Sequence, residues 1–209
     1  MQRRNILAGI ASLALLGACG KAAKLSAIAP GQVVLAFGDS VTFGTGAAPG
    51  EDWPSQLAEQ TGWQVINAGI PGDTAQAGKA RIQALLDEHH PALVIVEIGG
   101  NDFLRRRPPN DVKGDIRTLL KSIKQSGAQV VLVAIPELSL MSIVAGKPSD
   151  SPIFKELGKE EGVLIVSDVF SDVLSNPELC ADKVHPNAKG YRQMAGGLVA
   201  RFREIGLIR

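Results

Sequence analysis

Several features that define other classes of protein are scarce in this sequence of 209 residues. It has only two cysteines, Cys19 and Cys180, which are too few for a disulfide-stapled fold. Its 22 basic and 21 acidic side chains nearly cancel, so its charge gives no basis for binding nucleic acid. It has three histidines and no cluster of histidine and cysteine at metal-ligand spacing. We therefore expect no metal, no other cofactor and no nucleic-acid partner.

The N-terminus has the anatomy of an export signal. Arg3 and Arg4 form a basic start, and the apolar stretch at 6–16 is too short to span a bilayer. Small residues at 17–18 then precede Cys19, an order similar to the lipobox of bacterial lipoproteins. The resemblance implies cleavage before Cys19, lipid attachment to its sulfur, and a protein anchored in the cell envelope, with the outer membrane as the expected destination. An ordinary secretory signal, cut elsewhere, is the alternative.

These observations divide the chain into three parts. Residues 1–18 are the predicted signal peptide, and residues 19–31, which are mostly small with one proline, are predicted to be a tether. Residues 32–209 have the length of one domain. With Cys19 lipidated, Cys180 has no partner for a disulfide, and we expect it to be a small buried residue rather than a catalytic thiol.

Short apolar runs alternate with helical patterns throughout the predicted domain. Such alternation favours an α/β fold, a three-layer sandwich in which helices cover both faces of a parallel sheet. Right-handed crossovers bring the carboxyl ends of all strands to one edge, where active sites of such sheets lie. The predicted strands are 33–37, 63–67, 92–96, 130–135 and 163–166, and the predicted helices are 53–60, 74–88, 112–125, 152–161 and 188–205.

Polar residues that can carry chemistry follow the strands. Ser40 comes directly after the first strand, and His185 precedes the last helix with Asp182 three residues before it. A histidine held by an aspartate can take the proton of a serine, and the chain order Ser…Asp…His is one of several that build this triad. The blocks on this edge are Gly38-Asp39-Ser40, the glycine-punctuated loop 67–74, Glu97-Ile98-Gly99-Gly100-Asn101-Asp102 and Asp182-x-x-His185.

Each of these residues taken alone has a simpler explanation. A serine after a strand is usually a helix N-cap, Asn101 alone is more often a turn or cap residue, and Asp182 alone is a solvated loop carboxylate. Gly72 alone serves only its turn. The histidines favour the site, because those at 89–90 lie at a predicted helix end, where a cation suits the helix dipole, and only His185 lies in a loop.

The blocks together resemble the SGNH hydrolases, also known as GDSL esterases and lipases. The loop 67–74 and the block 97–102 are especially similar to the bacterial periplasmic acyl thioesterase and lysophospholipase subfamily. The resemblance implies a flavodoxin-like, five-stranded parallel sheet of order 2-1-3-4-5. It also implies particular roles for the site residues: Ser40 is the nucleophile, His185 the base and Asp182 its orienting residue, and the oxyanion hole consists of the Ser40 and Gly72 N–H groups and the Asn101 side chain, with Gly69 as a competing glycine.

Two segments depart from the family pattern. Arg105-Arg106-Arg107 makes the loop after Asn101 unusually basic, and it either faces an anionic headgroup or polymer or is a solvated run of charge. Residues 138–143 are more apolar than a surface loop needs, and they either line an acyl groove or pack under the loop. Both departures bear on the substrate rather than on the chemistry.

The sequence therefore predicts a serine esterase that hydrolyses acyl esters or thioesters, among them short-chain and aryl esters, lysophospholipid and acyl thioesters. The alternative enzyme is a carbohydrate O-acetylesterase that acts on envelope polysaccharide or peptidoglycan. The non-enzymatic alternatives are a flavodoxin-like ligand-binding lipoprotein, since residues 38–46 are glycine-rich without a P-loop ending, and a catalytically idle adaptor. The expected partners are a small-molecule or lipid ester and a membrane reached through Cys19, and no sequence signal indicates an oligomeric state.

Overall fold

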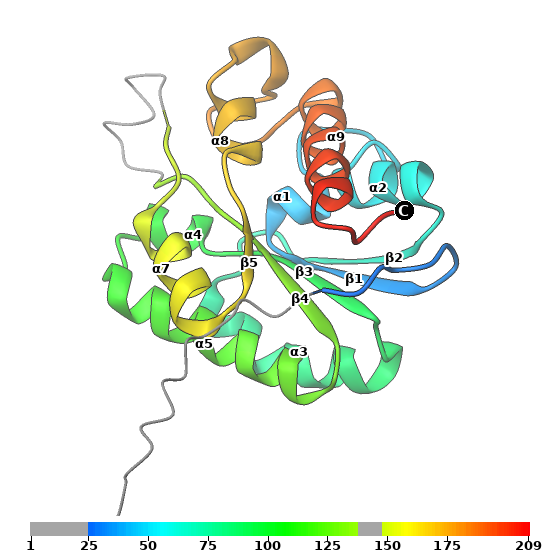
Figure 1. Ribbon diagram of the computed structural model, residues 1–209. Coiled ribbons are helices and arrows are strands. Elements are labelled where there is room, and N and C mark those ends of the chain that lie inside the picture. Colours follow the sequence, from blue (N-terminus) through cyan, green and yellow to red (C-terminus); the bar gives the residue numbers. More distant parts are fainter. Residues whose placement is uncertain (1–24, 138–147) are drawn as a thin grey trace, which may run out of the picture.

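The computed structural model describes residues 25–137 and 148–209, and a sheet of five parallel strands lies at its centre, in the order β2-β1-β3-β4-β5 (Figure 1). Every pair of neighbouring strands is parallel. The fold class and the strand order predicted from the sequence are confirmed. The strands are β1 (Val33–Gly38), β2 (Gln64–Gly69), β3 (Leu93–Glu97), β4 (Gln129–Val133) and β5 (Leu164–Val166).

Helices cover both faces of this sheet (Figure 1). Because the inner strands are covered on both sides, the side chains from Leu93 to Val96 are all at 0 % exposure, which explains why their sequence is continuously apolar. One face carries α3 (Ala75–His89), α5 (Pro109–Gln125) and α7 (Pro152–Glu161), and the other carries α2 (Trp53–Thr61), α8 (Val169–Leu174) and α9 (Ala188–Glu204).

Local sequence sets where the long helices begin and end. The side chains of Asp52, Thr74 and Asn187 accept hydrogen bonds from N–H groups in the first turns of α2, α3 and α9. Helices α2 and α7 end at Gly62 and Gly162, which adopt left-handed φ angles of +70° and +62°. The long helices therefore lie where the sequence predicts them, except that α5 starts earlier than expected.

Several short elements are missing from the sequence prediction. Each is shorter than two turns of helix, which is too short to show an apolar period. Two of them directly follow β1 and β3, so they carry residues of the predicted site. These elements are α1 (Ser40–Phe43), α4 (Gly100–Leu104), α8 and the 3₁₀ turn Pro177–Leu179.

Part of the predicted tether lies against the domain. Ile28 is buried, its N–H donates to the Leu207 carbonyl at 2.8 Å, and its own carbonyl accepts from the Trp63 indole at 3.1 Å. The Gln129 side chain also pairs with the backbone of Ser26. The packed part of the chain thus includes residues ahead of the predicted boundary at residue 32.

Some predictions concern residues outside the described ranges. They are the signal peptide at 1–18, the lipidation site Cys19 and the apolar stretch at 138–143. Within residues 25–137 and 148–209, no helix combines the length and the apolar character that crossing a membrane requires.

Candidate active site

Ser40 stands where β1 leaves the sheet. Gly38 is the last residue of β1, and a Cβ there would lie 2.3 Å from the Glu97 carbonyl oxygen. Glycine is needed at this position, because any side chain would collide with the neighbouring strand. Asp39 caps the helix that follows by accepting from the Val41 N–H at 3.0 Å. Ser40 is therefore the first residue of α1 and not its N-cap.

Ser40, His185 and Asp182 are hydrogen-bonded in a row. His185 Nε2 lies 2.9 Å from Ser40 Oγ, and His185 Nδ1 lies 2.8 Å from Asp182 Oδ2. Asp182 Oδ1 accepts from the N–H groups of Val184 and His185, at 2.8 Å each. These backbone bonds fix the carboxylate against the loop that carries the histidine. The structure thus brings together the three residues that the sequence singled out from opposite ends of the domain.

The charge on Asp182 decides how the histidine can act. Burial acts to raise the pKa of Asp182, but hydrogen bonds from the His185 ring and from two backbone N–H groups outweigh it and hold that pKa below its ordinary value. An ionised Asp182 keeps a proton on His185 Nδ1, which leaves Nε2 to accept from the Ser40 hydroxyl. The row is able to deprotonate Ser40 as its oxygen attacks an electrophile.

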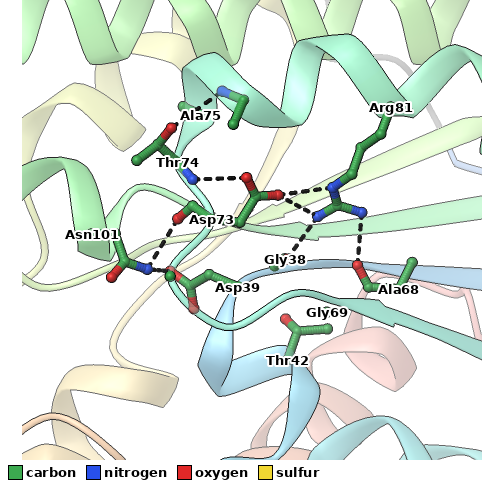
Figure 2. A network of polar contacts seen from close by, with 12 residues as sticks. Gly38, Asp39, Thr42, Ala68, Gly69, Asp73, Thr74, Ala75, Arg81 and Asn101 are labelled. Carbon is green, nitrogen blue, oxygen red and sulfur yellow. Dashed lines mark hydrogen bonds and ion pairs between the residues drawn. The ribbon is translucent and has the colours of Figure 1, made fainter.

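Asn101 approaches the same turn from α4 (Figure 2). Its Nδ2 donates to Asp39 Oδ2 at 3.1 Å and to the Asp73 carbonyl oxygen at 3.0 Å. These acceptors are the chain neighbours of Ser40 and Gly72, so the amide bridges the two segments with the predicted backbone donors. Asn101 therefore lies beside the segments that carry Ser40 and Gly72, and it belongs to a helix rather than to a turn.

Two glycines compete as the backbone donor: Gly69, the last residue of β2, and Gly72, in the loop between β2 and α3. The Gly69 N–H already donates to Asn67 Oδ1 at 3.0 Å, and a Cβ on Gly69 would lie 2.1 Å from the Phe43 nitrogen. Close packing of β2 against α1 therefore explains Gly69. Gly72 has a left-handed φ of +80°, and no acceptor in the described ranges bonds its N–H. Between the two, Gly72 has the N–H that is free to bind an oxyanion.

A buried carboxyl group lies beside the nucleophile, at Asp39. The side chain is 2 % exposed, and this desolvation raises the pKa of Asp39 to about 6. The Val41 N–H, the electrostatic effect of His185 and the Asn101 amide all act in the opposite direction, to lower it. The sequence analysis assigned no role to Asp39 beyond its place in the first block.

A second buried carboxyl group, Glu97, lies at the end of β3. Burial raises the pKa of Glu97 well above its ordinary value, and the neighbouring charge of Asp39 raises it further. Glu97 Oε2 accepts from the Thr42 hydroxyl at 2.7 Å, while Oε1 is buried with no partner among the described residues. Burial therefore favours the protonated form of Glu97. The sequence signal that could have identified Glu97 is an acidic residue at the end of a continuously apolar strand.

The run of three arginines is not a uniform charged surface. Arg105 Nη2 donates to the Gly72 carbonyl oxygen at 3.0 Å. Arg107 pairs with the fully buried Asp102 of the same segment, and Arg106 is exposed at a φ of +56°. Two of these arginines are thus bonded to the loop and the helix beside the site. The sequence analysis considered headgroup binding and free solvation for this run, and it did not consider bonds within the protein.

A cavity of about 60 Å³ opens beside Ser40. This volume holds a few water-sized groups, which suits the carbonyl of a reacting ester rather than a large ligand. Its lining combines polar and apolar side chains, among them Glu97, Asn101, Leu104, Phe170 and His185.

A serine, a histidine and an aspartate in this hydrogen-bonded order, at the carboxyl edge of a parallel sheet, define the class of the serine hydrolases. The chain belongs to the GDSL-like Lipase/Acylhydrolase family, which matches residues 36–193. The family that the sequence blocks resemble is thereby confirmed, and the protein is a hydrolase.

The relatives of this chain bear esterase and thioesterase names. It is 33% identical over 184 residues to thioesterase 1/protease 1/lysophospholipase L1 of Escherichia coli K12, covering 85% of this chain and 86% of that protein. It is 31% identical over 172 residues to the arylesterase of Vibrio mimicus, covering 78% and 84%. The crystal structure of TesA superposes with a TM-score of 0.73 at 26% identity, covering 83% of this chain and 99% of that one. The esterase EstA of Pseudoalteromonas sp. has the same fold, with a TM-score of 0.71 at 24% identity and coverage of 83% and 97%.

The raised pKa of Asp39 predicts how stability depends on pH. The pKa is 3.8 ordinarily and about 6 in the folded protein. Well below pH 3.8 the group is protonated in both states, so it adds no pH dependence. As the pH rises toward 6 the unfolded chain loses this proton first, so the free energy of unfolding falls, by on the order of 3 kcal/mol, and above pH 6 it falls no further.

Chemical denaturation of the wild type and of Asp39→Asn from pH 4 to pH 7 checks this expectation. The wild type should lose stability relative to the variant as the pH rises through this window, because the variant has no proton to lose at this position. A difference in unfolding free energy that stays constant from pH 4 to pH 7 would contradict it.

Proposed function

We propose that this hydrolase is a serine esterase in which Ser40 is the nucleophile, His185 the general base and Asp182 the residue that orients the base. The observation that carries the proposal is the continuous row from Ser40 Oγ through the imidazole to an ionised carboxylate, with contacts of 2.9 and 2.8 Å. Such a row holds a base at hydrogen-bond distance from the hydroxyl that it has to deprotonate.

The reaction has two halves. In the first, His185 Nε2 takes the Ser40 proton as Oγ bonds to the carbonyl carbon of an ester or thioester, and the π electrons move to the carbonyl oxygen. The tetrahedral intermediate then collapses, the C–O or C–S bond breaks, and the imidazolium gives its proton to the leaving alcohol or thiol. In the second half, water attacks the acyl-serine in the same way and releases the carboxylic acid and free Ser40.

The negative oxygen of each intermediate accepts from the N–H groups of Ser40 and Gly72 and from the Asn101 amide. The Ser40 N–H lies in the first turn of α1, outside the intrahelical ladder. The Asn101 amide donates to two acceptors in the resting structure, so its donation to the oxyanion replaces one of these bonds. Donors that are in place before the charge develops stabilise the transition state more than the substrate.

The substrate that we propose is an ester or thioester with an apolar acyl or aryl group. Among the described residues, the exposed large hydrophobic side chains are Phe43, Ile70 and Leu104, at 55%, 47% and 43% exposure. Phe43 ends the helix that Ser40 begins, the Ile70 N–H donates to the end of β1, and Leu104 lines the cavity beside Ser40. Exposed apolar side chains on the segments around Ser40, one of them lining the cavity, favour an acyl chain over an acetylated sugar, which needs polar partners.

We also propose that the protein is a lipoprotein of the cell envelope, with residues 1–18 as its signal peptide and Cys19 as the lipidated residue. The support is the order of a basic start, a short apolar stretch and small residues before Cys19. Acyl chains on this cysteine would hold the enzyme at a membrane, since each buried CH₂ contributes about 0.8 kcal/mol. The enzyme would then meet lipid esters at the surface where they occur.

The first test concerns the nucleophile. Ser40→Ala should lower kcat for an acyl ester by about 10⁴-fold or more, because no acyl-enzyme can form. A fluorophosphonate should label the wild type and the matched control Ser175→Ala, but not Ser40→Ala. Undiminished hydrolysis by purified, folded Ser40→Ala would overturn the proposal.

The second test concerns the acyl group. Phe43→Ser should lower kcat/KM for p-nitrophenyl octanoate by about tenfold, while p-nitrophenyl acetate stays within about twofold, because burying an apolar side chain is worth roughly 1.5–3 kcal/mol. Phe43→Leu is the control that keeps the apolar contact and the chain-length preference. The panel should run from acetyl to palmitoyl esters beside lysophospholipid and acetylated sugars. Faster turnover of acetylated sugars, unaffected by Phe43→Ser, would favour an O-acetylesterase instead.

The third test concerns the anchor. Metabolic labelling with palmitate should mark the wild type and the control Cys180→Ala, but not Cys19→Ala, because the sulfur of residue 19 is the site of attachment. Cell fractionation should find the two labelled proteins with membranes. Wild-type protein that incorporates no label would refute the lipoprotein proposal and leave the esterase proposal standing.

A further inference from the structure

Arg81, on α3, reaches the carboxyl ends of two strands and the loop beside the nucleophile (Figure 2). Its Nη2 donates to the Gly38 carbonyl oxygen, its Nη1 to the Ala68 carbonyl oxygen and its Nε to Asp73 Oδ2, each at 2.8 Å. The guanidinium carbon also lies 3.9 Å from the centre of the Phe37 ring. The side chain is 19% exposed, so this planar group is held on several sides at once.

The acceptors of Arg81 flank the N–H groups that the proposed mechanism uses. Gly38 is two residues before Ser40, and Asp73 directly follows Gly72. The other carboxylate oxygen of Asp73 accepts from the Thr74 N–H at 3.0 Å, which ties the loop to the start of α3. The two segments that carry the backbone donors are therefore held by one side chain.

The same network reaches the third donor. The Asp73 carbonyl oxygen accepts from Asn101 Nδ2 at 3.0 Å, so the backbone that Arg81 orients is also the backbone on which Asn101 rests (Figure 2). In this arrangement Arg81 and the Asp73 side chain would act without contacting the substrate. Their effect on the reaction is through the placement of the donors.

We propose that Arg81 is the positioning residue of the oxyanion hole: by holding the backbone at Gly38 and the side chain of Asp73, it sets the Ser40 and Gly72 N–H groups and the Asn101 amide at their mutual distances. This inference rests on the proposed function, because it assumes that these groups bind an oxyanion. The requirement for several acceptors in one plane is why arginine and not lysine occupies the position, since a lysine ammonium is a point charge without a fixed fork.

The alternative is that the ion pair only stabilises the fold. A buried ion pair is itself weak evidence of stabilisation, because the desolvation of its charges offsets much of their attraction. Lys79, two residues earlier on the same helix, provides the matched comparison. It pairs with Asp115 of α5 and, among the described residues, makes no hydrogen bond or ion pair with the segments that carry the donors.

The experiment compares Arg81→Met, Arg81→Lys and the control Lys79→Met with the wild type. The thermal midpoint of each protein is measured first by circular dichroism. The values of kcat and KM are then measured at a temperature at which all four proteins are folded. Misplacement of donors by about 1 Å costs on the order of 100-fold in rate. We expect Arg81→Met to lower kcat by about 10- to 100-fold with KM within about twofold, and Arg81→Lys to recover part of it. Lys79→Met should lose stability without losing kcat. The rate of fluorophosphonate labelling of Ser40 should fall with kcat, since the phosphonyl oxygen uses the same donors.

Non-additivity gives an independent readout. If Arg81 acts through the oxyanion hole, Arg81→Met combined with Asn101→Ala should slow turnover by much less than the product of the single effects. Should Arg81→Met fail to fold, Arg81→Lys and Asp73→Asn carry the same comparison. A folded Arg81→Met, or a folded Asp73→Asn where Arg81→Met does not fold, with kcat within twofold of wild type overturns the inference, and so does an equal loss in Lys79→Met. Failure of the proposed function is distinguishable, because Ser40→Ala would then keep its activity whatever Arg81 does.

Discussion

The pairing register across the sheet places Gly69, Gly38 and Glu97 side by side at its carboxyl edge, and the site depends on this row. At each of the two glycines a Cβ would lie within 2.3 Å of a neighbouring atom, so the following helix can sit directly on the ends of β1 and β2. A helix as short as α1 cannot hold its own position, because a single turn costs more entropy than its hydrogen bonds return. The location of Ser40 is therefore set by this contact with the sheet.

Buried carboxyl groups surround that row, and hydrogen bonds or ion pairs compensate for most of their burial. Unpaired, each would cost several kcal/mol as a charge in an apolar interior. Asp73 pairs with Arg81, and Asp102 pairs with Arg107 and accepts from the N–H of the first residue of α3. Asp39 accepts hydrogen bonds from the Asn101 amide and from the N–H of Val41 in α1. Glu97 Oε1 has no partner among the described residues, and burial raises the pKa of Glu97 well above its ordinary value. Such a network connects the loops through polar bonds rather than apolar packing. Burying these polar groups lowers the stability of the fold, but it holds the site in one geometry.

Much of the fold could be predicted from the sequence, because buried strands carry their own signature. A strand covered on both faces, such as β3, has to be apolar throughout, and this run is visible without a structure. The short helices α1 and α4 carry no such signature, since one turn shows no period. Ser40 and His185 were identifiable because histidine is rare in this chain and the blocks around both residues resemble one family. Arg81 was not, because its partner Gly38 lies 43 residues away and an arginine in a helical pattern is normally solvated.

The sequence by itself determined the order of strands and helices along the chain and the residue types at the strand ends. Through the hand of the crossovers it also determined that the carboxyl ends of the strands meet at one edge. These are consequences of local pattern and chain chirality, which need no long-range contact to be read. Only the tertiary structure decided that Gly72 rather than Gly69 has the free N–H, that Arg107 pairs with the buried Asp102, and that burial raises the pKa values of Asp39 and Glu97. Hydrogen-bond availability and pKa depend on which distant segments exclude water from a group, and packing alone creates those neighbours.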